Sequence, residues 1–133
     1  LLELEVTENT VFENVTELSN LIRQIHLAGF GCSMDDFGSG YSSLNLIQDI
    51  PVDTIKLDKS FFRNLDHMAR TESVVGSVIS MSKALSMVTV AEGVETKEQL
   101  EMLKRLHCDY IQGYYFAKPM PIYEFEQLLK PIQ

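Results

Sequence analysis

The feature that most constrains the fold of this chain is the alternation of short apolar runs with longer segments of helical periodicity. Five such pairs follow one another along the sequence. The apolar runs predict strands near 2–6, 30–37, 54–57, 87–91 and 110–113, and the periodic segments predict helices near 10–28, 42–48, 71–85, from 96 onward, and 122–129. This succession predicts an α/β fold in which parallel strands are joined by right-handed crossovers.

Residues with strong backbone preferences mark where several helices begin and end. Gly29 follows the first helical pattern and is expected to terminate it, and Pro51 ends the second. The run 96–99 places Gln99 three residues after Thr96, which is the spacing of a capping box at a helix start.

Two architectures fit five parallel units, an open five-stranded sheet and part of a (β/α)8 barrel. A whole barrel takes about 250 residues, so the 133 residues would supply just over half of one. The chain begins at Leu1 rather than Met, at the first predicted strand, so we expect it to be cut from a longer protein. We predict one incomplete domain over residues 1–133.

The charge balance narrows the classes of partner. Asp and Glu number 19 and Lys and Arg 11, for a formal net charge of −8, which argues against a protein that holds long nucleic acid on a basic surface. A small phosphorylated ligand remains compatible, because carboxylates can hold divalent cations that attract phosphate. The sequence has neither a membrane-spanning run nor a signal peptide, and its two cysteines lack metal-ligand spacing. We therefore expect a cytoplasmic protein with no membrane contact from this segment.

Polar side chains stand at the end of every predicted strand. Because catalytic groups of (β/α)8 barrels lie at the carboxyl ends of the strands, this pattern favours the barrel and locates a candidate site. The alternative is that these are solvated loop residues. They are Glu5 and Glu8, Asp35 and Asp36, Lys56 and Asp58, Glu92 and Glu95, and Gln112.

The adjacent pair Asp35 and Asp36 is the strongest local feature. Two neighbouring carboxylates repel each other near a sheet end unless a cation neutralises them. Mg²⁺ or Mn²⁺ suits carboxylate and water ligands, and two ions about 3.5–4 Å apart could share the pair and hydrolyse a phosphodiester. The alternative is a turn in which one Asp caps a helix. The following 38–40 run, Gly-Ser-Gly, would let backbone approach a phosphate.

Lys56 and Glu92 carry further chemistry. Lys56 lies in an alternating strand and could balance the acidic cluster, orient a water, contact phosphate or act as a Schiff-base nucleophile. A salt bridge to Asp53 or Asp58 is its structural alternative. Glu92 follows an apolar run and suits a metal ligand or a general base. The aromatic run 114–116 could stack a purine or pack in the core.

Five ordered motifs together resemble the later part of the EAL-domain cyclic-di-GMP phosphodiesterases of bacteria. The ending 117–121, Ala-Lys-Pro-Met-Pro, fits the same family, and the match covers essentially the whole chain. The motifs are 5–8 (Glu-Val-Thr-Glu), 35–44 (Asp-Asp-Phe-Gly-Ser-Gly-Tyr-Ser-Ser-Leu), 56–61 (Lys-Leu-Asp-Lys-Ser-Phe), 91–96 (Ala-Glu-Gly-Val-Glu-Thr) and 112–114 (Gln-Gly-Tyr).

The resemblance implies a barrel that binds two Mg²⁺ or Mn²⁺ ions and hydrolyses cyclic di-GMP to linear pGpG. The implied metal ligands are Glu5, Asp35, Asp36 and Glu92. The implied catalytic groups are Lys56, Glu92 (as base) and Gln112. Supporting and loop-anchoring roles fall to Glu8, Asp58 and Glu95. Substrate contacts fall to Gly38, Ser39, Gly40, Gln112, Tyr114 and Pro119.

The sequence departs from the family at its start. The Glu-Ala-Leu motif, the Arg that follows it and a downstream metal-binding Asn are not in the 133 residues. We therefore expect the chain alone to be inactive or nearly so, with weakened metal binding. A second hypothesis is a truncated ligand-binding or interaction module that forms homo-oligomers, or pairs with the missing N-terminal part, through open barrel edges. A third is a Schiff-base lyase that uses Lys56.

Overall fold

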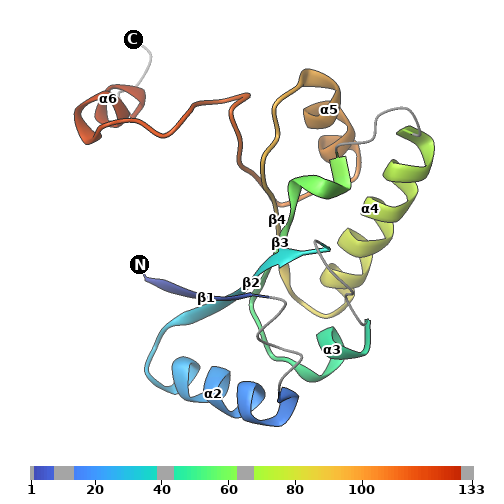
Figure 1. The fold of residues 1–133 in the computed structure, drawn as a ribbon, viewed down its shortest axis with the longest axis vertical. Helices are drawn as coiled ribbons and strands as arrows, with labels where there is room; N and C mark the ends of the chain where they lie inside the picture. Colours follow the sequence, from blue (N-terminus) through green and yellow to red (C-terminus); the bar gives the residue numbers. More distant parts are fainter. Residues whose placement is uncertain (1, 8–13, 39–43, 63–67, 130–133) are drawn as a thin grey trace.

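The chain folds around a single parallel sheet. The structure, a computed structural model, describes residues 2–7, 14–38, 44–62 and 68–129. The strands stand in the order β1-β2-β3-β4-β5, and all neighbours pair in parallel; Figure 1 labels the first four. The strands are β1 (Glu3–Thr7), β2 (Gly31–Phe37), β3 (Thr54–Leu57), β4 (Val88–Ala91) and β5 (Tyr110–Ile111). The predicted α/β fold is confirmed, and sequential order is how a (β/α)8 barrel adds its strands.

Helices α2 to α5 wrap around one side of the twisted sheet, whereas α6 stands apart from it (Figure 1). They are α2 (Val15–Leu27), α3 (Leu44–Asp49), the 3₁₀ helix η1 (Lys59–Phe62), α4 (Met68–Ala84), α5 (Lys97–Arg105) and α6 (Ile122–Leu128). The start of the first predicted helix, at 10–13, lies outside the described residues, and η1 was not predicted.

The capping box at the start of α5 is confirmed. The Thr96 hydroxyl accepts a hydrogen bond from Gln99 N at 3.3 Å, and Gln99 Oε1 accepts one from Thr96 N at 3.0 Å. The Gln99 amide also donates to the carbonyl of Phe62 at 3.3 Å, which ties the helix start to η1.

The hydrophobic core lies between the sheet and helices α2 to α5. Strand β3 shows the alternation that produces it, because Ile55 and Leu57 are fully buried while Lys56 between them faces the other side. Helix α4 adds Val75 and Ile79 to this core. No helix in the described ranges has the length and hydropathy needed to cross a membrane.

Two aspartates tie the strand starts together at the opposite end of the sheet from the predicted site. Asp53 directly precedes β3, and its Oδ2 accepts hydrogen bonds from Cys32 N at 2.8 Å and His26 Nε2 at 2.9 Å. Asp109 directly precedes β5, and its Oδ2 accepts bonds from Thr89 N at 2.9 Å and Thr89 Oγ1 at 2.7 Å. The same device therefore holds β2 against β3 and β4 against β5.

Asp109→Asn is expected to reduce the loss of stability in acid. Burial raises the pKa of Asp109, but the hydrogen bonds from Thr89 and the charge of Lys83 outweigh it and lower the pKa below its usual value. A carboxylate with a lowered folded-state pKa stabilises the protein above its unfolded pKa of about 3.9, and this contribution disappears as pH falls through the folded-state value.

Thermal melts from about pH 6 to about pH 2, a range that covers the titration of an aspartate, test this prediction. The wild type should lose melting temperature below about pH 4 more steeply than Asp109→Asn does. The exposed Asp49 on α3 supplies the control, because Asp49→Asn should follow the wild-type curve. Identical slopes for Asp109→Asn and wild type would contradict the role of Asp109.

Candidate functional site

A bulge in β2 separates the two adjacent aspartates. Met34 pairs with Ile55 and Phe37 pairs with Leu57, so Asp35 and Asp36 together stand opposite one residue of β3. Asp36 accommodates the extra residue with a φ of +56°, a left-handed conformation that aspartate adopts more readily than most side chains. As a result both aspartates stand outside the core between the buried residues Met34 and Phe37, and Phe37 returns to the core.

One backbone pattern positions the polar residues that follow β3, β4 and β5. Each of these residues donates its N–H to the carbonyl of the last residue in the preceding strand. This hydrogen bond fixes the backbone position from which the side chain projects. These bonds join Asp58 to Phe37 (3.2 Å), Glu92 to Leu57 (3.0 Å) and Gln112 to Ala91 (2.8 Å). The strand ends therefore form a regular edge from which these side chains project.

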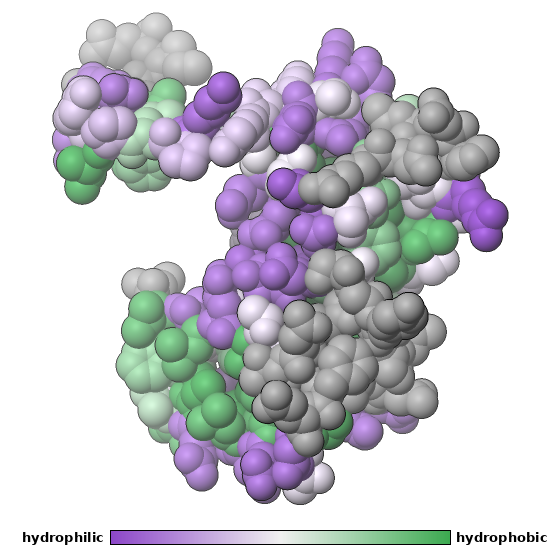
Figure 2. Space-filling model, in the orientation of Figure 1, coloured by the Kyte–Doolittle hydropathy of each residue, from purple (hydrophilic) through white to green (hydrophobic). Residues whose placement is uncertain are grey.

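Lys56 brings three predicted metal ligands together on the open face of the sheet. Its Nζ lies 2.7 Å from Glu5 Oε1, 3.0 Å from Glu92 Oε1 and 3.1 Å from Asp35 Oδ1, and the side chain is only 14% exposed. Figure 2 shows hydrophilic residues along this hollow side of the molecule. The carboxylates come from β1, β2 and the end of β4, so this cluster exists only in the folded chain.

These contacts settle the ion-pair partners of Lys56. Neither Asp53 nor Asp58 pairs with it, so the salt bridge considered from the sequence is not the one that forms. Burial lowers the pKa of Lys56, but the carboxylates of Glu5, Glu92 and Asp35 around its ammonium outweigh it and raise the pKa above its usual value. A permanently charged ammonium is a poor nucleophile, which argues against the Schiff-base lyase.

The donor chemistry around Lys56 fits a divalent cation. Asp35 Oδ1 and Ser33 Oγ, two residues apart on the same strand, are both buried, and neither has a hydrogen-bond partner in the described part of the chain. The contact from Asp35 to Lys56 is thus a charge contact without hydrogen-bond geometry, and buried oxygens of this kind are available to a metal or its water. Within the described ranges, however, no three ligating side chains surround an ion by themselves.

A pocket of about 460 Å³ opens beside this cluster, with Glu92 belonging to both. The pocket brings together side chains from the ends of β2, β3, β4 and β5. Seven predicted site residues line it, namely Asp36, Asp58, Glu92, Glu95, Gln112, Tyr114 and Pro119. Five of the nine predicted strand-end residues thus converge on one cavity, while Glu5, Asp35 and Lys56 form the cluster beside it.

Other predicted site residues lie elsewhere. Gly38 does not line the pocket; a Cβ on it would stand 1.9 Å from the ring of Phe61, and its φ is +91°. Its placement therefore serves a close approach of backbone to ring. Glu8, Ser39 and Gly40 lie outside the described residues. Tyr114 does not pack in the core, as one interpretation of the aromatic run had it. Its side chain is 57% exposed, and the centroid of its ring lies 5.6 Å from the ammonium of Lys118.

Sequence reasoning missed two residues of this region. Ser33 shares the open face with Asp35, and the two-residue period of a strand could have indicated it. Lys59 lines the pocket from η1, which had no signal of its own in the sequence.

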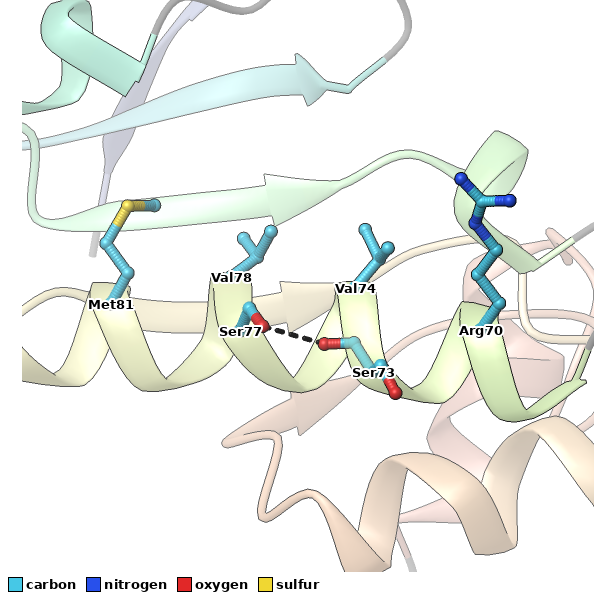
Figure 3. A pocket seen from close by; sticks show the side chains of 6 residues that line it. All are labelled: Arg70, Ser73, Val74, Ser77, Val78 and Met81. Atoms are coloured by element: carbon cyan, nitrogen blue, oxygen red, sulfur yellow. Dashed lines mark hydrogen bonds between the residues drawn. The ribbon is translucent and has the colours of Figure 1, made fainter.

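A second pocket, of about 510 Å³, lies along one side of α4 (Figure 3). It is lined by Arg70, Ser73, Val74, Ser77, Val78 and Met81, and the Ser77 hydroxyl donates to the Ser73 carbonyl at 2.8 Å. It shares no residue with the carboxylate site.

Comparison with known proteins places these observations in a family. The family model of the EAL domain matches residues 1–119. The cyclic di-GMP phosphodiesterase NbdA of Pseudomonas aeruginosa is 39% identical over 97% of this chain, which spans 16% of that protein. The chain therefore corresponds to a small part of a much longer relative.

Two solved structures carry the comparison further. The MucR phosphodiesterase of Pseudomonas aeruginosa, in complex with cyclic di-GMP, aligns with a TM-score of 0.83 and 38% identity over 96% of this chain and 50% of its own. A calcium and cyclic di-GMP complex from Klebsiella pneumoniae aligns with a TM-score of 0.81 and 32% identity, over 88% of this chain and 30% of its own. The open five-stranded sheet thus fits part of a barrel of this type.

Proposed function

Since the chain belongs to the EAL domain family, we propose that it contributes the C-terminal part of a cyclic-di-GMP phosphodiesterase site. One observation carries the proposal: Glu5, Asp35 and Glu92 converge on Lys56 at the carboxyl ends of the strands, next to the pocket. A compact group of carboxylates beside a cavity is suited to phosphodiester hydrolysis with divalent cations.

In this proposal Glu5, Asp35 and Glu92 hold one cation, and Asp36, which lines the pocket, belongs to a second. Bound Mg²⁺ or Mn²⁺ ions would activate water and stabilise the leaving oxygen of the phosphodiester. Opening one of the two phosphodiester bonds of cyclic di-GMP yields linear pGpG. The donors near Lys56 become a complete set only with ligands beyond those of the described residues.

The remaining side chains position the substrate and the carboxylates. Lys56 keeps its charge and holds Glu5, Asp35 and Glu92 within reach of one point. Glu92, placed between the cluster and the pocket, can also accept a proton from water. Gln112 presents its amide at the pocket wall, and the exposed ring of Tyr114 offers a surface on which a guanine can stack.

Binding and turnover by the purified chain test this function. Calorimetry with cyclic di-GMP should show binding that depends on Mg²⁺ or Mn²⁺, whereas pGpG formation should be negligible because the Glu-Ala-Leu motif is not in the 133 residues. Absence of binding with both cations would contradict the proposed site. Substantial turnover without any added segment would contradict the expected inactivity.

Replacing Asp36 separates its charge from its backbone conformation. Asp36→Asn retains a residue that tolerates positive φ, so the free energy of unfolding should change by less than about 0.5 kcal/mol. Asp36→Ala should cost about 1 kcal/mol, because a left-handed conformation is unfavourable for alanine. Both variants should lose cation-dependent cyclic di-GMP binding about tenfold, the effect of one charged contact. Equal destabilisation by both variants in urea titrations would contradict this separation.

A second candidate function is an interaction module, favoured by the apolar surface of the C-terminal segment. Within the described part of the chain, β1 and β5 each pair on one side only. The exposed apolar side chains include Tyr115, Phe116, Ile122, Tyr123, Phe125 and Leu128. We expect the chain to self-associate through this surface, and a strictly monomeric, folded species by light scattering at micromolar concentration would contradict it.

A further inference from the structure

The candidate pocket contains a lysine that the proposed function does not use. We propose that Lys59 binds a phosphate group of the nucleotide in the pocket that Asp36, Asp58, Glu92 and Glu95 line. This inference rests on the proposed function, because it assigns the residue that recognises the anionic part of that ligand.

The stem of Lys59 is held against the turn after β4. Gly93 has a φ of +65°, and a Cβ added there would lie 2.7 Å from Lys59 Cβ and 3.3 Å from Lys59 Cδ. The aliphatic part of the lysine therefore runs along bare backbone. Lys59 also begins η1, whose start is fixed by a 2.8 Å hydrogen bond from Ser60 N to Asp58 Oδ1. Two strand-end turns thus hold the stem of Lys59 at the pocket wall.

Lys59 has no ion-pair partner among the described residues. Four carboxylates line the same pocket, yet Lys59 makes no ion pair or hydrogen bond with any residue that the structure describes. Lys56, by contrast, has three carboxylates within 3.1 Å. Of the two lysines at the strand ends, one neutralises the acidic cluster and the other remains available to an incoming anion.

A phosphate is the group that this arrangement suits. A dinucleotide carries negative charge into a pocket of carboxylates, and a fixed ammonium offsets that repulsion and forms a charge-assisted hydrogen bond. Lysine acts on phosphate as a point charge, so a partly exposed pocket wall is sufficient and no bidentate geometry is required. The competing explanation, a solvated surface lysine, predicts no effect of its charge on ligand affinity.

Calorimetry on the 133-residue chain with cyclic di-GMP and Mg²⁺ tests the inference. Lys59→Met keeps an unbranched stem against Gly93 but removes the charge, and should weaken binding about tenfold. Lys59→Arg keeps the charge and should bind within about threefold of wild type. Lys104→Met, on α5 and outside the pocket, is the matched control and should bind as wild type does. The affinity of Lys59→Met should also depend less on salt.

The possible outcomes distinguish a failure of this inference from a failure of the proposed function. If the wild type does not bind the nucleotide, the proposed function and the inference both fail. If the wild type binds and Lys59→Met binds equally well with the same salt dependence, the inference alone fails. Thermal melts establish that each variant is folded, and Lys59→Gln replaces Lys59→Met should the latter lose its cooperative transition.

Discussion

Gly113→Ala is expected to lower the free energy of unfolding by about 3 kcal/mol, the upper range for forcing a methyl group into a filled site. A Cβ on Gly113 would lie 2.1 Å from the carbonyl oxygen of Val94 and 2.3 Å from its nitrogen. These are backbone atoms, so no side-chain rotation relieves the overlap. The clash also cannot be avoided by a small shift, because Val94 N donates to Gln112 O at 3.1 Å and Tyr115 N donates to Val94 O at 3.0 Å.

Urea titration of Gly113→Ala beside Gly31→Ala measures this effect. At Gly31 the nearest atoms to an added Cβ lie at 3.6 and 3.7 Å, an ordinary contact distance. Gly31→Ala should therefore leave the free energy of unfolding unchanged or raise it by up to about 1 kcal/mol. Gly113→Ala should also weaken nucleotide binding, since Gln112 and Tyr114 flank the displaced residue in the pocket wall. Equal free energies of unfolding for the two variants would contradict the close contact between Gly113 and the backbone of Val94.

Lys56→Met is expected to destabilise the chain by about 3 kcal/mol. Removing one partner of a buried charge pair costs about 3–5 kcal/mol. We expect the lower end of that range, because the side chain of Glu5 is half exposed. Without the ammonium, Glu5, Asp35 and Glu92 are left close together with no counter-charge, and their repulsion opposes folding.

A divalent cation should offset this loss, which makes the variant a direct test of the metal site. Mg²⁺ should raise the melting temperature of Lys56→Met more than that of wild type, because the carboxylates then have no ammonium to compete with the ion. Lys83→Met is the control: its ammonium lies 4.0 Å from Asp109 and donates to the His107 carbonyl. Both contacts are exposed, so the cost should stay below about 1 kcal/mol. A Lys56→Met protein as stable as wild type would contradict the role of this cluster.

Much of the architecture follows from local patterns in the sequence. The strand β3 was predicted at 54–57 and is observed there, because a buried strand and its alternation depend only on neighbouring residues. The start of α5 was predictable for the same reason, since the capping box lies within four residues. The 3₁₀ helix η1 was missed, because much of what holds it comes from distant segments: the Gln99 amide donates to the Phe62 carbonyl, and the ring of Phe61 stacks on that of Phe37.

The candidate site divides in a similar way. The polar residues at strand ends were predictable, because parallel strands present their carboxyl ends at one edge. Which of them meet was not, since Glu5, Asp35 and Glu92 come from three different strands and their distances depend on register. The bulge at Asp36 is a further example, because the extra residue is defined only relative to the paired strand β3.

The sequence by itself determined the parallel strand–helix order, the polar strand ends and the resemblance to EAL domains, all of which are carried by residues close together along the chain. Only the tertiary structure decided that Lys56 is surrounded by three carboxylates, while Lys59 forms no ion pair with any of the described residues. The physical reason is that charge pairing depends on distances of a few ångströms between distant segments, and strand register, the bulge at Asp36 and the turn at Gly93 set those distances.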